Sequence, residues 1–300
     1  MNCFNCKKII IYLFDCKDYV TNEKFRIFRC NYCNIDFPVQ RPLDVDKYYP
    51  KKYRNYNKFI KLLFDLMYTG KANFLNKFNY QNQRKILEIG CGNGLLLEKL
   101  KTLGWNVFGT ERSETVKNLN KNDLNITDKD ISKFEDNEFD MIILNNSFEH
   151  IINPFSLEVN FSKKLKSGGI LAITVPVSSS IQYKFGKNHW FHLDIPRHLQ
   201  IFKENYFEKY LKSNGLKLEI IKPIGFFWEF FGWFQTMNNK FFKNQNKFFR
   251  SLSDFNNFKK YFFLGFLQFS ILLLPTSVLT LYSFVSKKTS IKLFILKKIL

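Results

Sequence analysis

The chain has 300 residues, of which 45% are hydrophobic and 24% are charged. This length allows one large domain or a domain with a small module, and the apolar fraction excludes a disordered chain. Six cysteines in 300 residues exclude a disulfide-stapled secreted scaffold. The first eight residues lack the charged and apolar segments of a signal peptide. We therefore expect a cytoplasmic protein.

The formal net charge of +20 suggests a nucleic-acid partner, but codon bias is the favoured explanation of most of this charge. Lysine, asparagine, isoleucine and phenylalanine are enriched together, as an AT-rich coding sequence would produce. Positions 240–300 contain eleven lysines and arginines and one acid, Asp254. About half of the excess charge therefore lies in the last fifth of the chain.

Two C-x2-C pairs stand in residues 1–45, which we expect to form a small zinc-ribbon-like module. A spacer of 23 residues separates the pairs, and their four thiolates match a closed tetrahedral zinc site: Cys3, Cys6, Cys30 and Cys33. Such a metal folds a module too small to build its own core. Redox dithiols are the alternative. A helical linker is expected over 46–84, where apolar residues recur at helical spacing.

Short apolar runs alternate with helical patterns from residue 85 to about 222, which predicts a parallel α/β sheet with crossover helices. The predicted strands are 85–90, 105–110, 124–127, 139–145, 169–175 and 217–222, with a last strand at 291–296. The predicted helices are 94–103, 113–121, 155–165 and 203–213.

An apolar strand runs into three alternating glycines, Gly90, Gly92 and Gly94, before a helix begins. Glycines there allow positive φ and close approach of the backbone to a ligand. Leu95 stands where a dinucleotide fingerprint requires its third glycine. Glu88 lies just before the loop, where a carboxylate suits a cationic ligand better than a pyrophosphate.

Further polar residues follow the next three strands. Glu111 ends the second strand and can accept both ribose hydroxyls of a nucleoside. Asp130 and Ile131 follow the third strand, where a carboxylate and an apolar side chain suit an adenine ring. Asn145 ends the fourth strand.

This combination resembles the class I S-adenosylmethionine-dependent methyltransferases. The resemblance covers about 85–222 and the last strand. It implies a Rossmann-like, seven-stranded sheet whose last strand is antiparallel, with S-adenosylmethionine as cofactor. The methyltransferase domain would span 85–300. The implied cofactor-binding residues are Glu88, Gly90, Cys91, Gly92, Gly94, Glu111, Arg112, Asp130, Ile131 and Asn145.

All four histidines follow the fourth or fifth predicted strand: His150, His189, His192 and His198. Ligands of open α/β sheets bind beyond the carboxyl ends of the strands. His150 and His198 are therefore candidate bases for an acceptor hydroxyl, with His192 nearby in sequence. Arg197 could clamp an anionic group of the substrate. Alternatively, Asp194, Arg197 and His198 form a structural loop network.

Two segments narrow the resemblance further. Phe148-Glu149-His150 followed by Asn153-Pro154 resembles the branch that includes quinone and small-molecule methyltransferases. The run from Asp194 to Leu199 resembles a branch of bacterial surface-saccharide pathways whose members often carry an N-terminal cysteine module. The resemblance therefore implies methyl transfer to a hydroxyl, or alternatively a carbon, of a saccharide or a lipid-linked saccharide. A quinone-like acceptor is the alternative. An RNA acceptor is less favoured, because no Asn/Asp-Pro-Pro-aromatic motif follows the fourth strand.

A hydrophobic, basic insertion over 223–288 separates the last two predicted strands. It contains an uncharged run at 261–286 with lysine pairs on both sides. Pro275 interrupts this run, so we expect two short helices that lie on a membrane leaflet rather than one crossing. This predicts peripheral contact with the cytoplasmic face of the inner membrane through 226–286. The alternatives are a helical lid or a dimer interface, and the sequence leaves the oligomeric state undetermined.

Overall fold

The computed structural model describes residues 1–42, 46–49, 58–78, 84–111, 124–212, 214–243, 246 and 255–299. These residues form two compact units. Unit 1 contains Met1–Ile60, Pro176–Tyr206 and Pro223–Lys292, and unit 2 contains Lys61–Val175, Phe207–Lys222 and Leu293–Leu300. Both units are therefore assembled from separate stretches of the chain.

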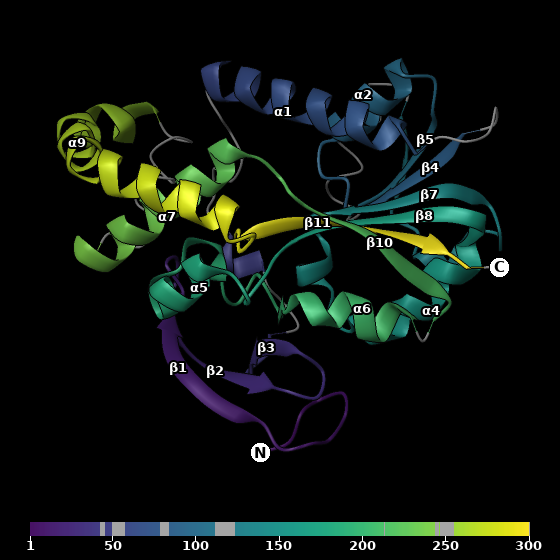
Figure 1. Ribbon diagram of the computed structural model, residues 1–300, viewed down its shortest axis with the longest axis horizontal. Coiled ribbons are helices and arrows are strands. Elements are labelled where there is room, and N and C mark those ends of the chain that lie inside the picture. The colour runs from purple at the N-terminus through teal and green to yellow at the C-terminus, as the bar shows by residue number, and fades with distance from the viewer. Residues whose placement is uncertain are drawn as a thin grey trace. The chain divides into compact units, whose positions relative to one another are not determined.

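A seven-stranded sheet forms the centre of unit 2 (Figure 1). Its strands lie in the order β10-β11-β8-β7-β4-β5-β6. In the same order they span Leu216–Pro223, Ile291–Lys298, Leu165–Pro176, Phe139–Asn145, Lys85–Ile89, Asn106–Thr110 and Asn125–Thr127. Chain order reverses on either side of β4, so the crossover connections place helices on both faces.

The strands from β8 to β6 are parallel, whereas β11 is antiparallel to its neighbours. Two backbone hydrogen bonds show this reversal. Val177, just after β8, donates to Ser290, just before β11, and Ile299, just after β11, donates to Gly215, just before β10. The α/β fold with an antiparallel last strand is therefore confirmed, and each predicted strand is present.

Helices α1 (Lys58–Asn76) and α2 (Leu95–Thr102) lie on one side of the sheet, and α4 (Pro154–Lys164) and α6 (Glu204–Lys212) lie on the other (Figure 1). The predictions at 94–103, 155–165 and 203–213 agree with α2, α4 and α6. The predicted helix at 113–121 lies outside the described residues. The central strands are apolar on both faces because helices cover both, and β7 is buried from Met141 to Leu144.

Unit 1 contains a four-stranded sheet in the order β1-β2-β3-β9. Its strands span Ile11–Lys17, Lys24–Cys30, Ile35–Pro38 and Ile201–Phe202. The first three come from the cysteine-bearing segment, and β9 pairs with β3 from far along the chain. A common hydrophobic core joins this sheet to the segment after β8, through residues such as Phe25, Ile27, Tyr183 and Trp190.

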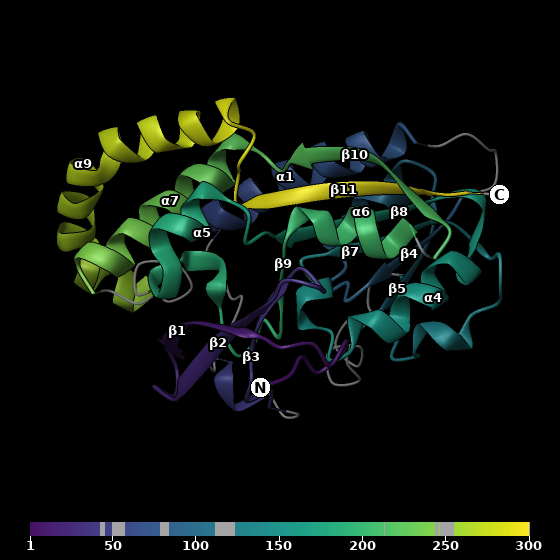
Figure 2. The ribbon, with the colours of Figure 1, turned by 60° about the horizontal axis from the view of Figure 1, so that its bottom comes forward.

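The described residues of the insertion include two helices, α7 (Phe226–Phe241) and α9 (Phe255–Val285), which pack against each other in unit 1 (Figure 2). The expected break at Pro275 is wrong, since this residue lies within α9, which is one helix of 31 residues. Proline removes one helical hydrogen bond and bends a helix without always ending it. Figure 2 shows α9 bent accordingly.

Candidate functional site

The glycine loop follows β4 at the carboxyl edge of the unit 2 sheet. Gly90, Gly92 and Gly94 have φ values of 71°, 57° and 75°. A Cβ atom on Gly90 would lie 2.7 Å from Ser147 Cβ, and one on Gly94 would lie 2.7 Å from Leu124 Cδ1. Other residues are therefore excluded there by both backbone conformation and space.

The neighbouring strand β5 holds this loop in place. The backbone N–H groups of Gly90 and Cys91 donate to Thr110 O at 2.9 and 3.1 Å. A Cβ on Gly109 would lie 2.8 Å from Cys91 Sγ, so the thiol packs on β5. Burial raises the pKa of the Cys91 thiol, which leaves it neutral. Cys91 thus has the contacts of a small packing residue within the loop.

Glu111 lies one residue beyond β5, beside the loop. Its Oε2 atom accepts a hydrogen bond of 2.7 Å from the backbone N–H of Gly92. The sequence predicted these two residues in one site on separate grounds, and the structure brings them into contact. A carboxylate at the end of the second strand, anchored in this way, is oriented to accept hydroxyl hydrogens.

Glu88 is buried in β4, two residues before the loop, with 2% of its surface exposed. Among the described residues, its Oε2 atom has no hydrogen-bond partner. Burial raises the pKa of Glu88 to about 8, and the charge of Lys71 opposes this rise. A buried carboxylate oxygen without a donor calls for a cationic or N–H group. Glu88 therefore fits the cationic methionine end of the cofactor that the sequence implies.

Lys71 is a site residue that the sequence analysis missed. It extends from α1 to the ends of β7 and β8, where its Nζ donates to Asn145 Oδ1 and, at 2.6 Å, to Thr174 Oγ1. Burial lowers the pKa of Lys71 to about 8, while Glu88 and Glu149 oppose this change. The sequence signal for this role was a lysine within an apolar helix. Other lysines lie in and near α1, so only the fold shows that this one reaches the site.

The remaining predicted cofactor residues of unit 2 also follow strands. Asp130 accepts a bond of 2.9 Å from the Ser132 N–H, and Ile131 is buried directly after it. Asn145 ends β7 and holds Lys71. Arg112 lies outside the described residues. Glu88, the glycines, Glu111, Asp130 and Asn145 thus all lie at the carboxyl ends of β4 to β7.

The four histidines divide between the two units. In unit 2, His150 ends a 3₁₀ turn, η3 (Phe148–His150), just after β7. In unit 1, His198 Nδ1 lies 2.9 Å from His192 O. A carbonyl only accepts, so Nδ1 carries the hydrogen and Nε2 carries the basic lone pair. Burial lowers the pKa of His198, which keeps this ring neutral at pH 7.

His192 differs from His198 in its surroundings. Burial, with a smaller contribution from His198, lowers the pKa of His192 to about 3. Its ring packs against Trp190 and Phe191. A base this weak is poorly matched to proton transfer near pH 7, so its environment is that of a packed core histidine. His189, in the same segment, is half-buried.

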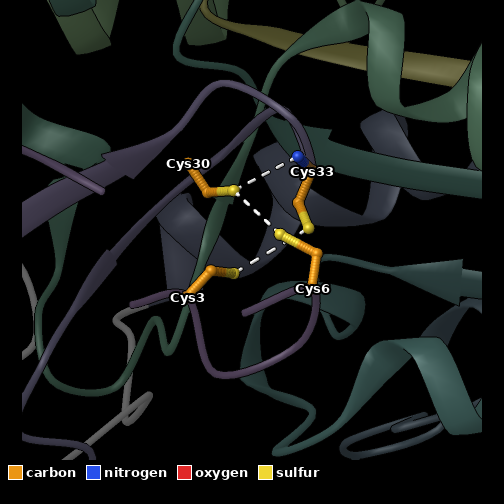
Figure 3. A group of neighbouring side chains, drawn as sticks. All are labelled: Cys3, Cys6, Cys30 and Cys33. Carbon is orange, nitrogen blue, oxygen red and sulfur yellow. Dashed lines mark hydrogen bonds between the residues drawn. The ribbon is translucent and has the colours of Figure 1, made fainter. Parts of the chain in front are cut away.

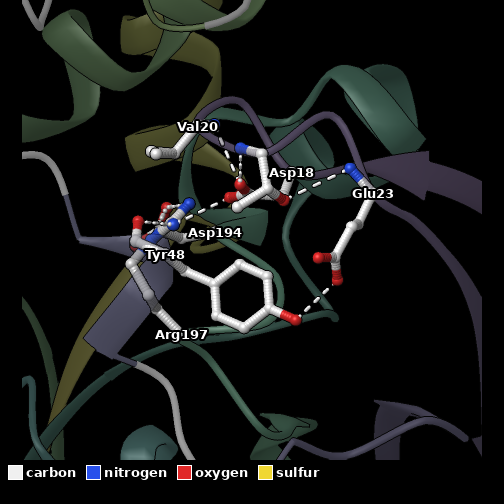
Figure 4. A network of polar contacts seen from close by, with 7 residues as sticks. Asp18, Val20, Glu23, Tyr48, Asp194 and Arg197 are labelled. Carbon is white, nitrogen blue, oxygen red and sulfur yellow. Dashed lines mark hydrogen bonds and ion pairs between the residues drawn. The ribbon is translucent and has the colours of Figure 1, made fainter.

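Arg197 is buried in a polar network of unit 1 (Figure 4). Its guanidinium donates to Asp18 at 2.8 Å, to Asp194 at 2.8 and 3.0 Å, and to Tyr48 O at 2.5 Å. These are the contacts expected of a structural loop network, the alternative to a clamp on substrate. Asp18 in turn accepts from the backbone N–H of Val20 and Thr21.

The four predicted metal-ligand cysteines form one cluster (Figure 3). Their Sγ atoms all lie within 4.8 Å of one another, with Cys3 and Cys33 at 3.8 Å and Cys6 and Cys30 at 3.5 Å. Four sulfurs about 2.3 Å from a tetrahedral zinc would lie about 3.8 Å apart. Lys7, one residue after the first pair, and Asn34, one residue after the second, both have positive φ. The two pairs thus form equivalent turns, and the cluster fits a closed metal site.

A family model described as a methyltransferase domain matches residues 51–220. Among curated relatives, a ubiquinone biosynthesis O-methyltransferase of Hydrogenovibrio crunogenus is 28% identical over 109 residues, 33% of this chain and 45% of that protein. A protein of the same name from Coxiella burnetii is 28% identical over 151 residues, 45% of this chain and 64% of its own length. The chain therefore spans from just under half to just under two thirds of the length of these relatives.

Among solved structures, a SAM-dependent methyltransferase from Archaeoglobus fulgidus aligns with a TM-score of 0.44 and 18% identity. The alignment covers 55% of this chain and 76% of that one.

Proposed function

Because the chain belongs to the methyltransferase-domain family, we propose that it methylates a hydroxyl group of a quinone-like, lipid-soluble acceptor. It is an S-adenosylmethionine-dependent methyltransferase. The observation that carries the cofactor assignment is the buried oxygen of Glu88, which no group among the described residues donates to, beside a glycine loop that Glu111 anchors.

Unit 2 supplies the residues that would hold S-adenosylmethionine. Glu88 and the loop Gly90–Gly94 would hold the methionine part, with Asn145 near the sulfonium. Glu111 would accept the ribose hydroxyls, and Asp130 with Ile131 would contact the adenine. When bound, this cofactor supplies a methyl carbon activated by a positively charged sulfur. The protein orients the acceptor and removes its proton.

The acceptor is proposed from the relatives. Both reported relatives are named ubiquinone biosynthesis O-methyltransferase, which favours the quinone-like acceptor over the saccharide that the sequence analysis placed first. The segment Phe148-Glu149-His150, which resembles the quinone branch, lies in the matched region. The contacts of Arg197 with Asp18 and Asp194 add no support for an anionic saccharide substrate.

Two histidines are proposed as the base that accepts the hydroxyl proton. His150 follows β7 next to the cofactor residues of unit 2. His198 keeps a neutral ring with its lone pair on Nε2. Each fits a proton acceptor at neutral pH, and single substitutions to glutamine separate their contributions.

We propose that the cysteine cluster binds a structural zinc ion. All four ligand positions are occupied by sulfur, which leaves no position for a substrate. Two N–H groups donate to cluster sulfurs. The Asn5 side-chain amide donates to Cys33 Sγ at 3.6 Å, and the backbone N–H of Cys33 donates to Cys30 Sγ at 3.3 Å. Such donors stabilise thiolate ligands and support a metal role over free dithiols.

The test is transfer of a radiolabelled methyl group from S-adenosylmethionine into a cell extract that is then divided into lipid, RNA, protein and small-molecule fractions. We expect label in the organic-soluble fraction, stable to mild acid, and less label with Glu111→Ala when the cofactor is limiting. A synthetic short-chain catechol should then accept the methyl group directly.

Other distributions of the label would indicate a different acceptor. Label that mild acid releases from the lipid fraction indicates a carrier-linked saccharide, and label in RNA overturns the small-molecule class. No transfer into any fraction, despite cofactor binding by calorimetry, contradicts the proposed activity.

A further inference from the structure

In helix α9 the exposed side is apolar and the buried side is mostly polar, which is the reverse of a helix in a water-soluble protein. Its exposed side carries an apolar stripe spaced by four and three residues, with exposures from 49% to 83%: Leu267, Ile271, Leu274, Val278, Leu281 and Val285. Its buried side is mostly polar, since Gln268, Thr276, Thr280 and Ser283 are at most 5% exposed. A helix in water buries its apolar side instead.

Three hydroxyl groups of α9 form hydrogen bonds within the protein, whereas Thr276 Oγ1 is buried without a partner among the described residues. Ser277 and Thr280 donate to the carbonyls four residues earlier, at 2.8 and 2.7 Å. Ser283 does the same at 3.0 Å and accepts a bond of 2.9 Å from Trp233 Nε1 of α7. Small hydroxyl residues at a helix contact and internally bonded polar groups are features of helices that face lipid.

Helix α7 is the more buried helix of this pair, and it connects α9 to the rest of unit 1. Gln235, Asn238 and Asn239 of its second half are buried, and Asn239 donates to His189 O at 3.0 Å. Glu229, near its start, accepts two bonds from Ser290, just beyond α9, at 2.6 and 2.7 Å. The start of α7 and the end of α9 are thus tied together, so the pair cannot cross a bilayer once.

The distribution of charge around α9 indicates what kind of surface its exposed apolar stripe can bind. No acid or base occurs between residues 261 and 286, and the window Leu267–Val285 has a mean hydropathy of 1.5 with 28% of it buried. Among the described helices, it is the one stretch long and apolar enough to cross a membrane. Lys287 and Lys288 follow it directly and are exposed. An apolar stripe that ends in exposed lysines is complementary to acyl chains beneath anionic headgroups.

We propose that the exposed stripe of α9 inserts into one leaflet of an anionic phospholipid membrane, with α7 as the support that holds it. This proposal concerns attachment and does not depend on the acceptor. Acceptors dissolved in the bilayer would then reach the enzyme without passing through water.

Flotation with vesicles of phosphatidylcholine and phosphatidylglycerol in a 3:1 ratio tests this. We compare the double variant Leu274→Asp/Leu281→Asp with Leu62→Asp/Leu66→Asp, which adds the same charges at exposed leucines of α1. Burial of each leucine contributes about tenfold or more to partitioning. The α9 variant should therefore lose about 100-fold, and the α1 variant should partition like the wild type.

Three results would overturn the proposal. The wild-type protein does not float with the vesicles, both double variants lose binding equally, or the α9 variant only converts a dimer into a monomer. The last result identifies the stripe as a contact between two copies of the chain. Cofactor affinity, measured by calorimetry on the same variants, stays unchanged if α9 serves attachment alone, which separates this test from that of the proposed activity.

Discussion

Lys71 Nζ lies 2.6 Å from Thr174 Oγ1, so a lysine of α1 is fixed at the carboxyl end of β8. The same ammonium interacts with Glu88 on β4, and burial moves the pKa of each group to about 8 from opposite directions. Near neutral pH the site without cofactor therefore holds a lysine that is close to losing its proton and a carboxyl group that is mostly protonated.

Cofactor binding near pH 7 should release protons. A cationic ligand favours the ionised form of Glu88 and the neutral form of Lys71, and both changes release a proton to solvent. Calorimetric titration in two buffers of different ionisation enthalpy measures this release. Glu88→Gln and Lys71→Met should each remove part of it, and equal release in all three proteins would contradict the assignment.

The same two groups give opposite dependences of stability on pH. The pKa of Glu88 is raised on folding from about 4.5 to about 8, so its contribution is full below pH 4.5 and is lost as the pH rises through 8. The pKa of Lys71 is lowered from 10.5 to about 8, so its contribution is full above 10.5 and is lost as the pH falls through 8. Glu88→Gln should therefore stabilise the protein more at pH 9 than at pH 5, measured by urea unfolding.

Glu111→Ala should weaken cofactor binding. Each hydrogen bond to a charged acceptor contributes about 1.5–3 kcal/mol, so loss of even one ribose contact lowers the affinity by at least about tenfold. Glu111→Gln keeps an acceptor oxygen and should have a smaller effect. Unchanged affinity of Glu111→Ala in calorimetry would refute the ribose assignment.

Purified protein should contain one equivalent of zinc, measured by elemental analysis. Cys30→Ser removes one ligand and should abolish tight zinc binding and lower the melting temperature, because the metal contributes folding free energy to the module. Cys16→Ser is the matched control, since Cys16 is buried nearby but lies outside the cluster. Equal metal content in the two variants would exclude the site.

Asp18→Asn should destabilise the protein, because it leaves the buried guanidinium of Arg197 with one carboxylate partner fewer. Removing one partner of a buried ion pair typically lowers the free energy of unfolding by about 3–5 kcal/mol. Because Asp194 remains as a partner of Arg197, we expect a loss at the low end of this range. Asp15→Asn, at an exposed position of β1, is the control. An equal free energy of unfolding for the two variants would show that the network carries little stability.

Local patterns predicted the strands and most helices well, because each strand of a parallel sheet is a short apolar run. The glycine loop and Glu111 were likewise readable, since their roles depend on backbone conformation and strand ends. Lys71 was not, because nothing local distinguishes it from neighbouring lysines until α1 is placed against β7 and β8. Pro275 misled the prediction, because a proline removes one helical hydrogen bond and can bend a helix without ending it.

The pairing of β9 with β3 has a consequence for how the chain folds as it leaves the ribosome. The partner of β3 is synthesised some 160 residues later, which at about 5–20 residues per second takes about 10–30 s. Throughout that interval the newly made cysteine segment has an open strand edge that can pair with other nascent chains. Early capture of a metal ion by the four thiolates would hold the segment in a defined shape while its last strand is still being translated.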